Sequence, residues 1–336
     1  MKENLPLWKL ALNASPDSFG LMPAGFSSSY ISSAPSVSPS KSLSSSPSII
    51  PSVSQESSDF SDDNGKKNNY IIGDEGNVVL EINIRLAGFG GMLPTEKFTE
   101  LTKNGVKQFQ RDYMKMGVPM GEVDYNTLKA IDEFSEKYRE NVSNYKCKCG
   151  SCGGFGKGQY KNQYQSTSKT EANHKYEYPG MHQSLLWAVS ASRFYLTKKL
   201  NNEYSIRSVN SAYRCWEDNK KNNRSTTNHM GKAVDLHFDK NKNRTHDMDI
   251  LREKIYCECI GAPKQGGNSK YKFGWLPNKF GLEPNKWADG GNAANTWIHF
   301  DVREFNKDMY LKDEFFIKSD NESNFNKKLT EISKGA

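Results

Sequence analysis

The chain has 336 residues, of which 35% are apolar and 25% charged, and this is too polar for one compact globule of that length. The net charge is +7, and the segment from Gly153 onward contains 30 basic and 21 acidic residues. Such a basic half attracts polyanions in general, whether nucleic acid, anionic lipid headgroups or a carboxylate-rich cell wall. No run of 18 apolar residues occurs, so we expect no membrane insertion.

The composition of the N-terminal region is typical of non-globular sequence. About half of the residues from Ser27 to Ser58 are serine, with four prolines among them and no apolar periodicity. Such a segment cannot bury enough surface to offset its ordering entropy, so we predict that residues 1–75 form a disordered tail and linker. The first apolar run is interrupted by Lys9 and is too short for the core of a signal peptide. Export, if it occurs, is therefore expected to use a route other than the general one.

A small all-α domain is predicted for residues 76–143. Apolar residues recur at helical spacing in three stretches, 79–89, 95–114 and 125–138. Glycines and prolines separate the first stretch from the second and the second from the third. The pattern therefore predicts three short helices.

This helical region resembles the three-helix peptidoglycan-binding domain of cell-wall hydrolases. The resemblance implies an anchoring module with no catalytic role. A generic helical bundle is the alternative, because most of the matching positions are apolar core positions. The matching residues are Thr102, Gly105-Val-Lys, Phe109-Gln110, Gly121, Val123-Asp124 and Thr127-Leu128.

A connector rich in glycine and cysteine is expected at residues 144–178. It contains Cys147, Cys149 and Cys152 at the spacing C-x-C-x-x-C. Three thiolates of this kind could be ligands of a structural zinc ion whose fourth ligand comes from elsewhere. The cysteines could instead form disulfides or stay unpaired, and the even total of six is compatible with disulfides. The sequence leaves these alternatives open.

An α+β domain with a central antiparallel sheet is predicted for residues 179–336. Residues 179–199 carry a strong helical pattern of apolar positions. Short β-like runs follow at 204–213, 232–238 and 296–302. A helix followed by two or more strands is typical of this fold class.

Two of the predicted strands carry metal-ligating side chains on one face. Alternation places Asp235 and His237 together on one strand, and His299 and Asp301 together on the other, with the opposite faces apolar. Imidazole nitrogen and carboxylate oxygen are ordinary zinc ligands. With His229 in the turn before the first strand, three ligands can meet around one point. The alternative is an ordinary sheet with one solvated face.

Three motifs in this half resemble those of the zinc peptidases related to D-alanyl-D-alanine carboxypeptidases and phage L-alanyl-D-glutamate endolysins. That family has a Ser-x-x-Arg segment, a His followed by Gly-x-Ala-x-Asp, and a late Trp-x-His. The resemblance covers roughly residues 180–305. Here the motifs are Ser211-Ala-Tyr-Arg214, His229 with Gly231-Lys-Ala-Val-Asp235, and Trp297-Ile-His299.

The resemblance implies a catalytic zinc ion held by His229, Asp235 and His299, with the fourth position open for water. It also implies that Arg214 is catalytic, because a guanidinium can hold a substrate carbonyl or carboxylate and steady a developing oxyanion. The alternative for Arg214 is an arginine on a surface strand. The expected substrate-binding residues are Ser211, Arg214 and Trp297.

The first departure from the family pattern concerns the spacing of the ligands. The family has six residues between the first His and the Asp, whereas His229 and Asp235 are separated by five. Either the turn is shorter, or His237 takes part in place of His229. We favour His229.

The second departure concerns the general base. Relatives carry an acidic residue just before the last His, where this chain has Asn295 and Thr296. Asp301 is expected to replace it as catalytic base, or else to orient His299 as a carboxylate behind the ligand. The reserve candidates are Asp289 and Glu283.

The sequence therefore predicts a zinc metallopeptidase that cuts peptide bonds in bacterial peptidoglycan, in the stem peptide or the crosslink. It would act in the periplasm or cell wall, as a phage endolysin or as an antibacterial effector delivered by a system such as type VI secretion. A secretion-apparatus component and a cognate immunity protein are expected partners. The alternatives are an inactive cell-wall-binding protein and a basic nucleic-acid binder. The second is disfavoured because no helix rich in arginine and lysine is predicted.

Overall fold

A computed structural model describes most of the chain from residue 69 onward, and all of these residues belong to one compact unit, Ser61–Ala336. The tail predicted for residues 1–75 lies outside the described residues up to position 68. Regular structure begins before position 76, because β1 (Asn69–Tyr70) pairs antiparallel with β2 (Val123–Asp124). The described residues are 69–158, 177–224, 227–262, 276–286 and 293–335.

Three helices form where the apolar periodicity places them: α2 (Asn77–Arg85), α3 (Glu100–Asp112) and α4 (Tyr125–Tyr138). The second helix starts later than predicted because Thr99 caps it, accepting a hydrogen bond from the backbone N–H of Thr102. The first helix ends at Arg85, although the apolar pattern continues into buried residues of the following turn.

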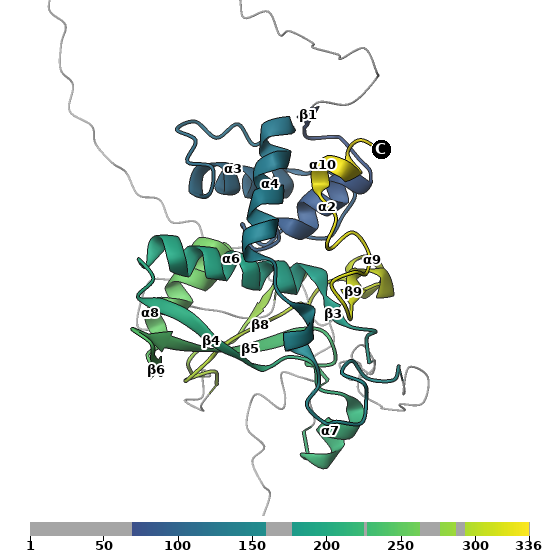
Figure 1. Cartoon of the computed structure of the whole chain (residues 1–336), viewed down its shortest axis with the longest axis vertical. Helices are drawn as coiled ribbons and strands as arrows, with labels where there is room; N and C mark the ends of the chain where they lie inside the picture. The colour runs from purple at the N-terminus through teal and green to yellow at the C-terminus, as the bar shows by residue number, and fades with distance from the viewer. Residues whose placement is uncertain (1–68, 159–176, 225–226, 263–275, 287–292, 336) are drawn as a thin grey trace, which may run out of the picture. The chain divides into compact units, whose positions relative to one another are not determined.

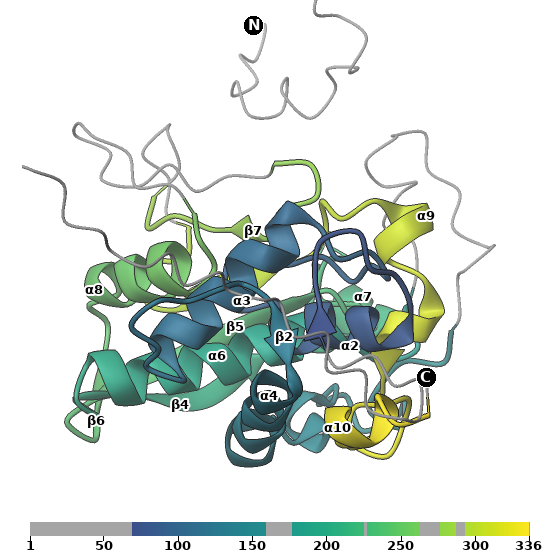
Figure 2. The same ribbon diagram turned by 90° about the horizontal axis from the view of Figure 1, so that it is seen from above.

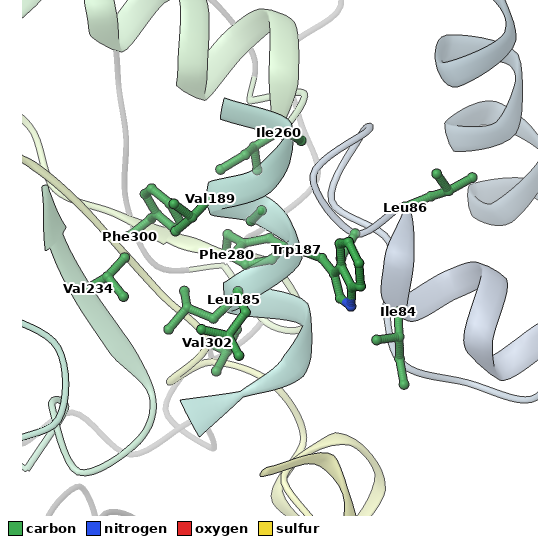
Figure 3. Packing of buried hydrophobic residues seen from close by; sticks show 14 of the residues in the cluster. Ile84, Leu86, Leu185, Trp187, Val189, Val234, Ile260, Phe280, Phe300 and Val302 are labelled. Atoms are coloured by element: carbon green, nitrogen blue, oxygen red, sulfur yellow. The ribbon is translucent and has the colours of Figure 1, made fainter. Parts of the chain in front are cut away.

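Helix α6 (Gln183–Lys199) is the central layer of this unit, between the three helices and the sheet (Figure 1). Nearly all of its side chains up to Leu196 are buried, as expected for a helix covered on every side. It packs on β4 on one side, and Figure 2 shows it lying along that strand; α2 and α4 pack against it on the other. Figure 3 shows the two faces, with Leu185 and Val189 directed at the sheet and Trp187 directed at the turn after α2.

The main sheet is antiparallel, which confirms the predicted α+β fold class. Its strands run in the order β4 (Tyr204–Ser211), β5 (Ala233–Lys240), β8 (Ile298–Asp301) and β7 (Gly281–Leu282), and β6 (Asn243–Thr245) also pairs with β5. The alternation predicted for β5 and β8 is confirmed on the apolar side. The side chains of Val234, Leu236, Phe238, Ile298 and Phe300 are fully buried.

Short elements connect these layers. Helix α6 starts at Gln183 rather than at 179 because β3 (Met181–His182) first pairs with β9 (Phe316–Ile317). Among the described residues, no helix is long and apolar enough to cross a bilayer. The remaining elements are η2 (Val142–Tyr145), α7 (Trp216–Lys221), α8 (Asp249–Arg252), the π-helix η3 (Glu253–Cys259), α9 (Lys307–Tyr310), η4 (Asp313–Phe315) and α10 (Leu329–Ile332).

A buried arginine ties the C-terminal segment to the first helix. The Arg85 guanidinium is 1% exposed, and its Nη2 donates to the carbonyls of Asn324 and Lys327 at 2.9 and 2.7 Å. Its other nitrogens lie 3.4 Å from Glu81 and 3.5 Å from Asp132. Because a buried charge is costly unless it is fully paired, this set of partners holds α2, α4 and residues 324–327 together.

Candidate metal centre

The candidate centre lies on the polar face of the main sheet, opposite the face that α6 covers. In the register of β5 and β8, Asp235 is directly opposite His299, and Ala233 is opposite Asp301. On the other side of β5, Ser211 at the end of β4 is opposite Asp235. Neighbouring antiparallel residues have side chains about 5 Å apart, so this register brings the sequence motifs together.

His229 reaches the same point from the turn before β5. Its Nδ1 lies 2.9 Å from the carbonyl oxygen of Ala212, and since a carbonyl can only accept, Nδ1 carries the proton. Its Nε2 therefore keeps its lone pair and lies 3.4 Å from Asp235 Oδ2. The turn depends on Gly231, whose φ is +102° and whose Cβ would stand 2.4 Å from the carbonyl oxygen of Gly180. This tight glycine turn accommodates the five-residue spacing.

His229, Asp235 and His299 each offer a ligand atom, and these atoms all lie within 4.8 Å of one another. All three residues are buried. Two imidazoles and one carboxylate are a donor set that catalytic zinc sites use, with a fourth position left for water or substrate. The Ala212 carbonyl behind His229 is the kind of outer partner that fixes the tautomer of a metal-ligating histidine. The donor set therefore fits a divalent metal such as zinc.

The charges around this point favour a bound cation. Burial lowers the pKa of His229 to about 3, so its imidazole is neutral and able to donate a lone pair. Burial raises the pKa of Asp235, but the hydrogen bond from His299 and the positive charges of His299 and Arg214 outweigh burial and bring that pKa to about 2. Burial lowers the pKa of His299, but its hydrogen bonds to Asp235 and Asp301 outweigh burial and raise that pKa to about 10. At neutral pH the Asp235 and Asp301 carboxylates are therefore anionic and the His299 imidazole between them is protonated. A metal ion bound between Asp235 and His299 would displace that proton.

Asp301 lies behind His299 and is fully enclosed. Its Oδ2 is 2.8 Å from His299 Nε2 and accepts from Arg303 Nε at 2.9 Å and from Asn228 Nδ2 at 3.1 Å. Its Oδ1 accepts from the backbone N–H of Arg303 at 2.8 Å. Burial raises the pKa of Asp301, but Arg303 and His299 hold it well below its ordinary value. Both oxygens therefore have strong donors already.

Glu283 follows β7 and also approaches His299. Its Oε1 lies 3.7 Å from His299 Nε2 and 3.6 Å from Arg303 Nη2. The side chain is 18% exposed, compared with 0% for Asp301. Burial raises the pKa of the Glu283 carboxyl. Of the two carboxylates, Glu283 is the one that reaches the surface. The other reserve, Asp289, lies outside the described residues.

Arg214 contacts the centre directly. Its Nη2 donates to Asp235 Oδ2 at 2.9 Å, and its Nε donates to the Ser211 hydroxyl at 2.5 Å. The backbone N–H of Arg214 donates to the carbonyl of His229 at 2.7 Å, which ties its segment to the turn before β5. Ser211 therefore orients the guanidinium, and Arg214 is 18% exposed beside the Asp235 carboxylate.

Two other sequence candidates are not members of this group. Trp297 lies one residue before β8 and is half-buried, and its carbonyl accepts from Arg252 Nη2 at 3.3 Å. His237 lies two residues beyond Asp235 on β5, opposite Ser208. Within the part of the chain that the structure describes, the converging group contains His229 and does not contain His237.

A second convergence involves cysteines. Cys147, Cys149 and Cys152 meet Cys215, with their sulfur atoms within 4.8 Å of one another, and none of the four is in a disulfide. Burial raises the pKa of the Cys149 thiol, but hydrogen bonds from Ser151 outweigh it and help to bring that pKa to about 6.

Several residues of these groups were not assigned a role from the sequence. Arg303 is two residues beyond Asp301 and four beyond His299. The alternation of side chains along a strand could therefore have placed Arg303 on the same face as both of them. Asn228 adjoins the His229 motif in sequence. Tyr256 gave no signal: it lies in η3, and its hydroxyl donates to the carbonyl of His299 at 2.6 Å.

Comparison of the sequence with known proteins does not identify a family for this chain. No protein-family model matches the sequence, and a search of curated proteins finds no match.

Proposed function

We propose that this chain is a zinc-dependent peptidase that hydrolyses peptide bonds in bacterial peptidoglycan. The observation that carries the proposal is the convergence of His229, Asp235 and His299, from two adjacent strands and the turn before one of them, at ligand-atom separations within 4.8 Å. When bound there, zinc would lower the pKa of a coordinated water molecule and polarise the carbonyl of the substrate. The identity and order of the three motifs, rather than the fold class, support the choice of a wall peptidase.

Arg214 is proposed to hold the substrate next to the metal. Its guanidinium is fixed by Ser211 on one side and Asp235 on the other, and part of it stays exposed. A fixed planar fork of N–H donors is suited to a peptide carbonyl or a terminal carboxylate, both of which occur in the stem peptides of peptidoglycan. The same charge would stabilise an oxyanion that forms during hydrolysis.

Glu283 is the carboxylate that we propose as general base, with Asp301 orienting His299. A general base must approach the attacking water, and the partly exposed Glu283 carboxylate lies beside a metal ligand. Asp301 has no exposed surface, and both of its oxygens accept hydrogen bonds from groups around it. Such an enclosed carboxylate fits the outer partner that holds a ligating histidine in place.

The two carboxylates should respond differently to isosteric replacement. Glu283→Gln should lower kcat by about 10²- to 10⁴-fold with zinc affinity retained, because it removes the base. Asp301→Asn should instead weaken zinc binding by about 10- to 100-fold, because it disturbs the orientation of His299. Chelator competition and steady-state kinetics on a soluble wall peptide measure both quantities. The exposed Glu314→Gln is the matched control. If Asp301→Asn loses turnover with zinc retained while Glu283→Gln stays active, the two roles are reversed.

Peptidoglycan as the substrate is supported by charge and by the helical layer. The basic C-terminal half suits an anionic wall. Helices α2, α3 and α4 are the segments that resemble a wall-binding module, and we propose that they anchor the enzyme. Thr102 and Gly105 have structural roles in this layer, since Thr102 donates to Asn83 Oδ1 and a Cβ on Gly105 would stand 2.7 Å from the Phe89 carbonyl. They define the shape of the module rather than the contact with the wall.

The test is digestion of purified peptidoglycan. The zinc-loaded protein should release fragments that mass spectrometry assigns to cleavage in the stem peptide or the crosslink, and protein treated with a strong chelator should release none. Pelleting of the protein with intact sacculi, without fragments, would instead show a wall-binding protein that lacks catalysis. Delivery as a secreted effector or an endolysin, with a matching immunity protein in the first case, is part of the same proposal.

A further inference from the structure

The four converging cysteines form a group that the peptidase chemistry does not use. Three of them come from the glycine-rich segment after η2, and the fourth, Cys215, directly follows Arg214. The sulfurs of Cys215 and Cys149 are 3.6 Å apart. Tetrahedral zinc with Zn–S bonds of about 2.3 Å places its sulfurs about 3.8 Å apart, whereas a disulfide requires about 2.05 Å. The spacing therefore matches four sulfurs around one ion.

The backbone of this segment is shaped to bring the sulfurs together. Gly150 and Gly153 each directly follow a cysteine and have φ values of +78° and +70°. Glycine adopts this left-handed conformation without strain, so the chain can reverse direction after each of the two cysteines. The N–H of Cys147 donates to the carbonyl of Gly154 at 2.7 Å and closes the loop.

Backbone N–H groups point at the sulfur atoms. The N–H of Cys215 lies 3.4 Å from Cys147 Sγ, that of Ser151 lies 3.4 Å from Cys149 Sγ, and that of Asp218 lies 3.4 Å from Cys215 Sγ. Donors of this kind stabilise negative charge on sulfur, and thiolate is the form that binds metal. Three of the four sulfurs thus have such a donor from the main chain.

We infer that Cys147, Cys149, Cys152 and Cys215 bind one structural zinc ion, separate from the ion held by the two histidines and Asp235. Four thiolates with no open position are the ligand set of a closed structural site. The fourth ligand comes from more than 60 residues along the chain, so the ion clamps the cysteine-rich loop to the segment between β4 and α7.

The clamp acts on the segment that carries Arg214. Beside Cys215, the N–H of Tyr213 donates to the carbonyl of Tyr145 at 3.0 Å, and its hydroxyl donates to the carbonyl of Tyr178 at 2.6 Å. The ring of Phe155 packs edge-on against Tyr213 with centroids 5.5 Å apart. Zinc bound by the cysteines would stabilise these contacts. It would thereby keep Arg214, the residue before Cys215, in its position against Asp235.

Metal analysis of the full chain, purified under reducing conditions, tests the inference. The wild type should contain two zinc ions per chain by elemental mass spectrometry. Cys149→Ser and Cys215→Ser should each lose the zinc at the cysteines and keep the other ion. His299→Ala should lose the ion at the histidine centre and keep the zinc at the cysteines. Cys257→Ser, a half-buried cysteine outside the group, is the matched control and should keep both. The Co²⁺-substituted His299→Ala protein should show thiolate-to-cobalt charge-transfer absorption.

Each result separates this site from the proposed active site. Zinc retained in His299→Ala, together with that charge-transfer absorption, supports the cysteine site even if no peptidoglycan is cleaved. A His299→Ala protein that is folded by circular dichroism, has all thiols titratable and contains no metal would overturn it. Two disulfides among the four cysteines in the freshly purified protein, shown by mass mapping, or iron in place of zinc, would overturn it as well.

Discussion

Replacing His299 with alanine should remove one zinc ion and lower hydrolysis of peptidoglycan by more than about 100-fold. Replacement of an outer partner of a metal ligand already costs about 10- to 100-fold in affinity or activity, and the loss of a ligand itself should cost more. His299 is enclosed between Asp235 and Asp301, at 2.7 and 2.8 Å, and within the described residues the converging group contains only one other histidine, His229. Metal content and the rate of fragment release measure the effect.

The matched control for this change is His246→Ala. His246 is an exposed histidine outside the converging group, and its replacement should leave both zinc content and rate unchanged. Circular dichroism must show that the His299→Ala protein keeps its fold, because the change alters a buried set of charges. A metal-free wild-type protein that still hydrolyses peptidoglycan would refute the assigned role of the centre.

Sending the chain to the periplasm of a Gram-negative host should cause rounding and lysis, whereas expression in the cytoplasm should be tolerated. The reason is location, because peptidoglycan lies outside the cytoplasmic membrane. Arg214→Ala should abolish the damage, since the guanidinium that contacts Ser211 and Asp235 would no longer hold the substrate. Culture density and microscopy after induction, with and without an attached signal peptide, are the measurements.

Arg207→Ala is the control for this second prediction. Arg207 lies on the same strand as Ser211, is half exposed and pairs with Asp239 at 2.8 Å, so its loss removes positive charge without touching the centre. When sent to the periplasm, the Arg207→Ala protein should cause as much lysis as the wild-type protein. Toxicity in the cytoplasm without the signal peptide would indicate a target other than the wall. Harmless periplasmic expression of folded, zinc-loaded protein would contradict a wall substrate present in that host.

The parts of the fold that follow local rules were predictable. Alternation along β5 and β8 gave an apolar face and a polar face on each strand, and the structure buries Val234 and Phe300 accordingly. Helix α4 has the predicted bounds because Asp124 caps it and its apolar spacing ends at Tyr138. The positions of His229, Asp235 and His299 followed from short motifs, since each motif places its candidate ligand within a strand or the turn next to it.

What the sequence could not show depends on partners that are distant along the chain. Whether Asp301 is exposed or enclosed is decided by Asn228, 73 residues earlier, and by the orientation of the Arg303 side chain. The proximity of Glu283 to His299 depends on the pairing of β7 with β8, and β7 is only two residues long. The meeting of Cys215 with the other cysteines requires the end of β4 to lie against η2, a contact with no local pattern in either segment.

The pairing of Arg85 with the backbone at Asn324 and Lys327 has a consequence for the order of events during synthesis. Helix α2 leaves the ribosome early, yet the acceptors for its buried guanidinium are made about 240 residues later, with separations of 239 and 242 residues. Until those carbonyls emerge, the helical layer contains a charge with an incomplete set of acceptors and stays open to rearrangement. The Arg85 guanidinium therefore obtains its full set of acceptors only after translation has passed Lys327, so the contacts around it are completed late in synthesis.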